Sequence, residues 1–356
     1  MKKVVLFFAL AVGLLTSAST LQAQVNTSRY ITLTVTNGAA IKLNFKAAAN
    51  GTPVRIVSGS NTQNITVGPD WYDRNWPGTF TVTAGSTTMT IYGDLTDFSS
   101  SGNYANLTAI DLSHNTQLQR LWCYSNQLTS LDVSKNTQLT TLDCGINTLS
   151  SLDVSHNTQL TTLDCKNNKL NSLNVSGCTQ LEELRCYDNN LTSLNVSNTQ
   201  LELLYCDGNN FSTQDLDDIY CSLPDRTGKK NGVIRPVYNS SSSYNNTVLA
   251  TNAQNATAKN WKVQYVDNTD IPTTGKHKCS ATDIAEAAAE PALTIYPNPV
   301  ADVLYLSATA RTIRIYNIYG IEVAHATDTD RVEVSHLPAG VYTVNADGKV
   351  AKMVKR

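Results

Sequence analysis

Five cysteines recur at a nearly constant spacing in the middle of this chain of 356 residues. They are Cys123, Cys144, Cys165, Cys186 and Cys206, so the period is 21 residues and shortens by one at the last step. Thiols at a fixed spacing can ligate a metal, pair as disulfides or do redox chemistry. Metal sites, however, need thiolates that converge from several directions, as Cys-x-x-Cys motifs allow. One thiol in the same phase of each repeat therefore indicates a shared packing position.

The cysteines belong to a longer repeat. The segments LQRLWCYSNQ, LTTLDCGINT, LTTLDCKNNK, LEELRCYDNN and LELLYCDGNN start at Leu118, Leu139, Leu160, Leu181 and Leu201. A degenerate copy begins at Leu95 and has Ser100 at the cysteine position. The pattern L-x-x-L-x-C-x-x-N-x-L is typical of leucine-rich repeats. One coil cannot bury its own apolar edge, so stacking of the coils into a solenoid provides the core.

Each repeat is expected to contain a short strand, in which successive side chains point to opposite faces. The leucine and cysteine positions then point inward, and the five thiols form a ladder with steps of about 4.8 Å. A free cysteine packs as a small hydrophobe, and an apolar core disfavours the thiolate. A disulfide between neighbouring rungs fits the Cα spacing but not the parallel Cβ directions, and five thiols cannot all pair. Packing is therefore favoured over a partial disulfide or a metal.

Asparagines form two further columns. The first follows the cysteines and comprises Asn126, Asn147, Asn168, Asn189 and Asn209. Buried amides there can bond backbone groups that the turning chain leaves unpaired. In the other half of each coil, the equivalent positions hold Asn115, Asn136, Asn157 and Cys178. Cysteine replaces asparagine in this repeat, so Cys178 is expected to be structural.

Other reactive side chains are scattered. His114 and His156 fall two coils apart, about 10 Å, which is too far for a shared metal. Asp111, Asp132 and Asp153 form a column, for which turn formation is favoured over calcium binding. No nucleophile, base and acid occur in a plausible frame. We therefore expect no enzyme activity, no metal and no cofactor.

The outward positions of the strands vary while the framework does not, and solenoids bind ligands on such a face. Aromatic residues and arginines there resemble binding hot spots. In an alternative interpretation these positions are ordinary surface, with Trp122 covering an end of the sheet. The predicted ligand-binding residues are Arg120, Trp122, Tyr124, Asp143, Asp164, Glu183, Arg185, Tyr187, Tyr205 and Asp207.

The chain begins like a secretory signal, with two lysines, an apolar run of 12 residues (4–15) and a cleavage site after Ala23. That run is too short to span a membrane. We expect a signal peptide (1–23), an N-terminal β domain that caps the solenoid (24–88), leucine-rich repeats (89–224), a C-terminal solenoid flank (225–270), a linker (271–291) and a small β-sandwich (292–356). Cys279, in or just before the linker, is expected to be the most exposed thiol. Any disulfide among Cys178, Cys221 and Cys279 is left open.

Two family resemblances follow from these motifs. The repeat, over roughly residues 89–224, resembles internalin-type leucine-rich-repeat surface proteins in the variant with a cysteine ladder. The tail is similar to the C-terminal sorting domain of type IX secretion cargo of the Bacteroidetes. Its matching motifs are YPNPV (296–300), IYNIYGIEV (315–323), LPAGVYTV (337–344) and the terminal KMVKR. The second resemblance implies export across the outer membrane, often with removal of the tail and attachment to surface polysaccharide.

The expected fold is mainly β, with a solenoid between an N-terminal β cap and a C-terminal β-sandwich. The expected protein is secreted or on the outer cell surface, with no transmembrane segment in the mature chain. It is adhesin-like, binds a protein or glycan, and uses residues 292–356 for the type IX machinery. The nearly balanced charge, 27 basic against 29 acidic residues, gives no indication of nucleic-acid binding. The alternative is a structural surface or biofilm-matrix component that self-associates.

Overall fold

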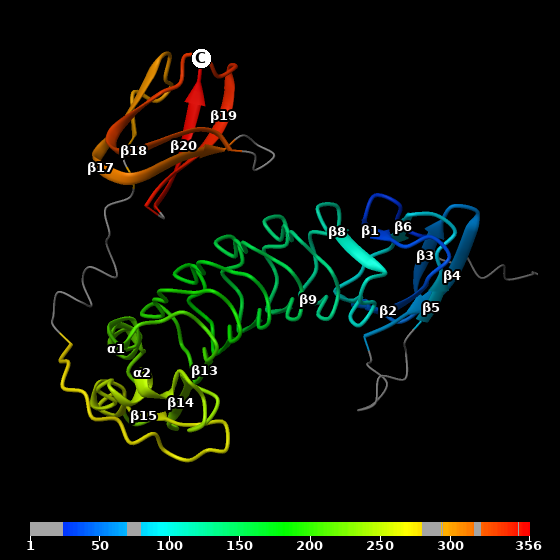
Figure 1. The fold of residues 1–356 in the computed structure, drawn as a ribbon. Helices are drawn as coiled ribbons and strands as arrows, with labels where there is room; N and C mark the ends of the chain where they lie inside the picture. Colours follow the sequence, from blue (N-terminus) through cyan, green and yellow to red (C-terminus); the bar gives the residue numbers. More distant parts are fainter. Residues whose placement is uncertain (1–23, 70–79, 280–292, 294, 317–321, 348) are drawn as a thin grey trace, which may run out of the picture.

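The computed structural model describes residues 24–69, 80–279, 293, 295–316, 322–347 and 349–356. The protein is mainly β, with a curved leucine-rich-repeat solenoid followed by a separate C-terminal sheet (Figure 1). This confirms the expected fold class. The expected signal peptide lies outside the described residues. Within them, no helix is both long enough and apolar enough to cross a membrane.

The described residues of the N-terminal unit form eight strands in two sheets. One sheet is antiparallel, in the order β4-β3-β6-β1-β8, and β2, β5 and β7 join the sheet of the solenoid. Alternate side chains such as Ile31 and Leu33 are fully buried, as expected for strands with one covered face. The strands are β1 (Tyr30–Val35), β2 (Ala40–Lys46), β3 (Thr52–Ser58), β4 (Asn61–Val67), β5 (Phe80–Thr83), β6 (Thr88–Tyr92), β7 (Asp97–Ser99) and β8 (Leu107–Asp111).

The solenoid contributes one short parallel strand per coil. The strands are β9 (Arg120–Trp122), β10 (Thr141–Asp143), β11 (Thr162–Asp164), β12 (Glu183–Arg185), β13 (Leu203–Tyr205), β14 (Gly232–Arg235) and β15 (Trp261–Val263). At the other end β7 pairs parallel with β9, and β2 pairs antiparallel with β7. One hydrophobic core consequently runs from Ile31 to Ile271.

Two expected boundaries change because of this shared sheet. The division between residues 88 and 89 falls inside β6, which pairs with β1 and β3, so the cap includes that strand. The flank after residue 224 is a continuation of the solenoid, since β14 and β15 extend the same parallel sheet. Three helices lie in this region: α1 (Thr213–Ser222), α2 (Asn245–Leu249) and α3 (Gln254–Thr257). A capping box of Ser212 and Asp215 begins α1.

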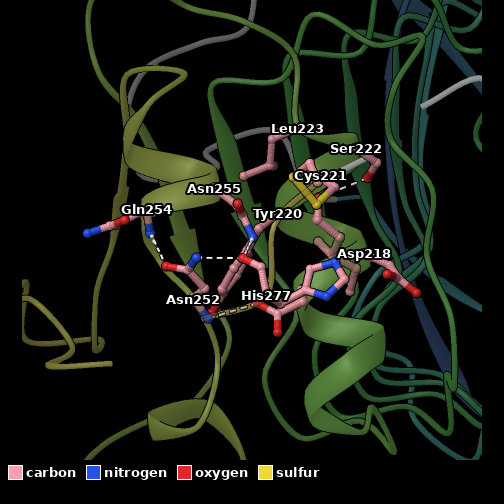
Figure 2. Close-up of a disulfide and its surroundings, with 12 residues drawn as sticks. Asp218, Tyr220, Cys221, Ser222, Leu223, Asn252, Gln254, Asn255 and His277 are labelled. Atoms are coloured by element: carbon pink, nitrogen blue, oxygen red, sulfur yellow. Dashed lines mark hydrogen bonds between the residues drawn. A yellow bond between two sulfur atoms is a disulfide. The ribbon is translucent and has the colours of Figure 1, made fainter. Parts of the chain in front are cut away.

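The segment 271–279, here called the strap, is not the linker that we expected. Cys279 forms a disulfide with Cys221 of α1, 58 residues earlier, so its thiol is not exposed and free (Figure 2). The two side-chain amides of Asn252 and Asn255 both donate to the carbonyl oxygen of His277, at 2.5 and 3.1 Å. The strap is therefore an integral part of the solenoid end.

Close backbone packing explains why a segment with few large apolar residues is held so firmly. Thr274 N donates to Leu249 O at 2.8 Å and Gly275 N donates to Thr251 O at 2.9 Å. A Cβ on Gly275 would lie 2.1 Å from Ala250 O, so only glycine fits there. Any linker must begin after Cys279.

The C-terminal unit has its own hydrophobic core. As expected, this unit is all β, and its described strands are connected in one antiparallel network by the long β17, which pairs with β16, β18 and β19. The register between β17 and β18 shifts between Tyr305 and Ala310. The strands are β16 (Ile295–Tyr296), β17 (Val303–Tyr316), β18 (Glu322–Glu333), β19 (Gly340–Ala346) and β20 (Lys349–Lys355).

Candidate recognition face of the solenoid

The five thiols of the repeat lie inside the solenoid. Each is fully buried and free, at equivalent positions of successive coils. The backbone keeps them in register, since Cys123 N donates to Asp143 O at 2.8 Å and Cys144 N donates to Asp164 O at 2.9 Å. Burial raises the pKa of every one of these thiols far above the usual range. They are therefore protonated and unreactive at neutral pH.

The first asparagine column joins neighbouring coils by side-chain to backbone hydrogen bonds. Asn147 Nδ2 donates to Cys123 O of the preceding coil and Cys144 O of its own coil, both at 3.0 Å. Its Oδ1 accepts from Leu128 N at 3.0 Å. The same three bonds recur, each within 3.1 Å, at Asn126, Asn168, Asn189 and Asn209. Each side chain thus satisfies backbone groups that the turns leave unpaired.

The second column is less completely bonded. Asn157 Nδ2 donates to Val133 O at 3.0 Å and Asn136 O at 2.9 Å, but its Oδ1 has no partner among the described residues. Asn115 begins this column, and Cys178 continues it with a weak Sγ contact to Val154 O at 3.7 Å. Cys178 is buried, and burial raises its pKa to about 11. The structure thus places this thiol in a packing position.

The acidic column and the histidines do not converge. Asp111, Asp132 and Asp153 each accept a bond at 2.9 Å from the backbone N–H of the serine two residues later. Such contacts are turn-forming. The ring of His114 stacks on Tyr30, with centroids 4.2 Å apart. In the described part of the chain, no group of three His, Cys, Asp or Glu side chains is placed to hold a metal.

The outward strand positions line up across the sheet. Trp122, Asp143, Asp164, Arg185 and Tyr205 form one row, with each residue opposite the next in the parallel register. This position rules out the alternative that Trp122 covers an end of the sheet, because β9 is an internal strand. Two of the predicted ligand residues are less accessible than expected: Asp164 is 3% exposed and Asp207 is 8% exposed.

The charges on the C-terminal half of this face pair with one another. Asp164 lies 2.7 Å from Lys166 Nζ and 3.7 Å from an Arg185 nitrogen. Arg185 also forms an ion pair with Glu183. Because these neighbouring groups cover it, Asp164 is buried, and a ligand would have to displace existing partners to reach it.

The aromatic rings of the same half are also engaged. Tyr205 lies between Arg185 and Arg235, whose guanidinium carbons are 5.7 and 4.4 Å from the ring centroid. Lys166 Nζ lies 5.9 Å from the ring centroid of Tyr187. Sequence reasoning missed Arg235, because β14 lies beyond the last copy of the repeat. Its signal was the strand-like segment that follows α1.

The N-terminal half of the face differs in its carboxylate, although here too a cation lies over a ring, with the guanidinium carbon of Arg120 5.7 Å from the ring centroid of Trp122. Asp143 accepts a bond from Gly145 N at 3.1 Å, and among the described residues no lysine, arginine or histidine forms an ion pair with it. Burial, with a smaller contribution from neighbouring Asp164, raises the pKa of Asp143 to about 6. Arg120 pairs instead with the buried Asp97. This half therefore offers a carboxylate that is not committed to a cation.

Two large apolar residues that sequence reasoning did not select lie in the turns just after strands of this half of the face. Tyr104 is 68% exposed and Ile146 is 46% exposed. Both have left-handed backbones, with φ of 51° and 53°. Tyr104 lies close enough to Tyr124 to contribute to the raised pKa of that phenol, after burial and Asp143. Tyr104, Trp122, Tyr124, Asp143 and Ile146 are called the aromatic patch below.

The raised pKa of Asp143 predicts a pH effect on stability. The unfolded carboxyl has a pKa near 3.9, so the folded state binds its proton more readily between about pH 4 and 6. The contribution of this group is thus most favourable below pH 4 and is lost as the pH rises through 6. Urea unfolding across this range should show Asp143→Asn gaining stability relative to the unmodified chain as the pH increases.

A matched control is Asp153→Asn. Hydrogen bonds from Ser155 lower the pKa of Asp153, so its contribution is present above the unfolded pKa and is lost as the pH falls. The relative stability of this variant should decrease as the pH rises from about 2 to 4. The same trend for both variants would contradict the environment assigned to Asp143.

The tail can be assigned by family. Residues 294–356 match the secretion system C-terminal sorting domain, which confirms the expectation from the tail motifs. This type IX domain marks secreted, cell-surface proteins, so the chain is a secreted protein of the cell surface. No curated protein matches the sequence.

Several solved structures are similar to this chain. The functional domain of InlJ from Listeria monocytogenes, which includes a cysteine ladder, has 20% identity and a TM-score of 0.31, with 69% of each chain covered. A leucine-rich-repeat protein of Leptospira interrogans has 20% identity and a TM-score of 0.29, with 43% of this chain and 34% of that chain covered. The internalin InlF of L. monocytogenes has 18% identity and a TM-score of 0.29, with 35% and 43% covered.

Proposed function

We propose that this cell-surface protein is an adhesin-like recognition protein, without enzyme activity, that binds a protein or glycan on the strand face of its solenoid. The observation that carries this proposal is the aromatic patch. It combines two exposed apolar residues, Tyr104 and Ile146, in the turns after the strands with the strand-face positions of Trp122, Tyr124 and Asp143, and Asp143 forms no ion pair among the described residues. Contiguous exposed apolar surface of this kind marks interaction sites.

The physical case rests on anchoring and rigidity. Tyrosine and tryptophan supply large contact areas and a polar atom that fixes orientation, which suits both protein surfaces and sugar rings. The stacked coils hold the backbone in register, so little conformational entropy is lost on binding. Asp143 can accept hydrogen bonds from ligand hydroxyl, amide or cationic groups.

This proposal narrows the ten-residue face predicted from sequence. Asp164, Glu183 and Arg185 already pair with one another, so engaging them requires breaking existing ion pairs. We assign these three residues, with Tyr187, Tyr205 and Asp207, to the rim. Rim contacts affect charge matching and association rate more than affinity.

The absence of catalysis is part of the proposal and has its own support. The thiols of the repeat are buried and protonated, which deprives them of nucleophilic character. Asp143, the carboxyl with a raised pKa on the open half of the face, forms no hydrogen bond with a histidine or serine in the part of the chain that the structure describes. We therefore propose that the face binds its ligand without a cofactor and without a chemical step.

The test is a double substitution, Trp122→Ala with Tyr124→Ala. Hot-spot aromatics contribute about 2 kcal/mol or more each, so each single change should weaken binding at least ~30-fold and the pair, if the contributions add, about 700-fold. The full chain would be assayed on a glycan array and against surface-labelled bacterial and host cells, with circular dichroism to verify folding. Tyr205→Ala is the matched control, because it removes a ring of the rim, and it should change affinity less than about threefold.

The opposite ranking would move the site to the C-terminal half of the face. If the chain adheres equally well with and without both patch aromatics, the strand face is not the binding site. The second candidate function, a structural surface component, requires self-association instead. That function is favoured by the unpaired edge of strand β4 in the N-terminal sheet, which does not involve the aromatic patch.

A further inference from the structure

Strand β4 is an open sheet edge. In the order β4-β3-β6-β1-β8 it is terminal, and among the described residues it pairs only with β3. Figure 1 places it at the outer margin of the N-terminal unit, away from the coils. Thr62, Asn64 and Thr66 are all exposed. A terminal strand of seven residues presents unpaired backbone groups to any strand that can approach.

The hairpin geometry identifies which groups those are. A two-residue turn, Gly59–Ser60, joins β3 to β4, so the closing pair Ser58 and Asn61 exchanges backbone hydrogen bonds. Bonding then alternates along β4, which leaves the N–H and C=O groups of Thr62, Asn64 and Thr66 directed outward. Pro53 is consistent with this assignment: it lies opposite Thr66 and has no N–H to donate, which only a non-bonded pair tolerates.

Three other sheet edges in the described residues are protected. The edge of β15 is covered by the strap, since Ile271 N donates to Val263 O at 3.0 Å. The edge of β8 is met by the following coil, where Gln127 N donates to Leu107 O at 3.1 Å. Strand β20 carries three lysines. In contrast, β4 has the sequence NTQNITV, with no charge, no proline and no register shift against β3. It lacks the usual features that prevent edge pairing.

We propose that β4 pairs antiparallel with β4 of a second copy of this chain, on a two-fold axis through Asn64. In this register Asn64 faces the partner's Asn64, and Thr62 faces the partner's Thr66. All outward backbone groups then meet outward groups, which gives roughly six hydrogen bonds, two for each of three bonded pairs. Threonine and amide pairs across the strands add to these bonds, and no charge meets a like charge.

The pairing has a consequence for surface display. It joins two five-stranded sheets into one and leaves the solenoid coils of both copies outside the interface. The dimer therefore carries two strand faces. Two linked sites convert the second binding event into an intramolecular one and raise the apparent affinity for a dense surface. The inference does not depend on the ligand face, because β4 belongs to a different sheet from the strands of that face.

The first test is sedimentation of the full chain over a concentration series. A reversible monomer–dimer equilibrium is expected, and Thr62→Lys with Thr66→Lys should weaken it at least tenfold, because lysines then face each other across the axis. The control is Thr81→Lys with Thr83→Lys on β5, where both threonines are also exposed and the changes should leave the equilibrium unchanged. A chain that is monomeric throughout, or an equal effect of both variants, would overturn the proposal.

The second test locates the axis without weakening the sheet. Residues opposite each other in a bonded antiparallel pair have Cα atoms about 5.5 Å apart, which suits a disulfide. Asn64→Cys should therefore give a covalent dimer on mild oxidation, and Thr81→Cys should not. The ladder thiols do not interfere, since they are fully buried. Failure of Asn64→Cys to cross-link would exclude this register.

Discussion

Replacing Asn147 by alanine is expected to lower the free energy of unfolding by about 3 to 5 kcal/mol, because each buried backbone group left unpaired costs about 1 to 3 kcal/mol. The side chain donates to the carbonyl oxygens of Cys123, Cys144 and Gly145 and accepts from Leu128 N. Alanine cannot replace any of these bonds. Since both neighbouring coils lose contacts, the loss falls on the interface between coils, which supplies solenoid stability.

Two controls make this prediction specific. Asn190→Ala changes an exposed asparagine of the same repeat whose side chain makes no hydrogen bond in the structure, so it should cost less than about 0.5 kcal/mol. Asn157→Ala should fall between the two, because its side chain makes two bonds and its Oδ1 is unpartnered. Urea unfolding followed by circular dichroism would give the ranking. Equal losses for Asn147 and Asn157 would contradict the role assigned to the first column.

Much of the solenoid could be predicted because its repeat fixes the phase of every side chain. Leu142 and Cys144 had to point inward once they recurred every 21 residues beside variable positions, and both are fully buried. The asparagine positions follow from the same argument, since a turning chain leaves backbone groups unpaired at the same place in each coil. Periodicity therefore specifies the framework of this protein well.

The candidate site was less predictable because its accessibility depends on contacts between coils. Asp164 was expected to be open, but Lys166 and Arg185 cover it. Tyr104 lies in the degenerate first copy and Ile146 in a left-handed position between the cysteine and the asparagine. Both residues lie in turns outside the strands, so the inward–outward alternation of strand side chains gave no reason to select them.

The repeat pattern also could not predict that the cap and the solenoid share one sheet. Strand β2 reaches β7 across more than fifty residues of sequence, and this pairing is set by tertiary packing. Short strands with the same alternation are compatible with several pairings. The same limit applies to Cys221 and Cys279, because disulfide connectivity cannot be deduced from spacing alone.

Removing that disulfide, with Cys221→Ser and Cys279→Ser together, is expected to destabilise the solenoid end by about 4 kcal/mol. The bridge closes a loop of 58 residues, and the loss of this constraint on the unfolded chain accounts for that magnitude. Reduction of the unmodified protein should have the same effect. Alkylation should then label Cys279 and, once release of the strap uncovers the 3%-exposed Cys221, two thiols per chain before global unfolding and all eight after it, because the other six are buried inside the solenoid.

The effect should be local, which separates it from a general loss of stability. The strap covers the edge of β15 and packs on α1 through the disulfide, so its release exposes the last coils first. Coils of a solenoid contact only their neighbours, so the damage decreases with distance from the end. Amide hydrogen exchange should accelerate from α1 to β15 while β9 and β10 keep their protection. Uniform acceleration would show instead that the strap stabilises the whole solenoid as one cooperative unit.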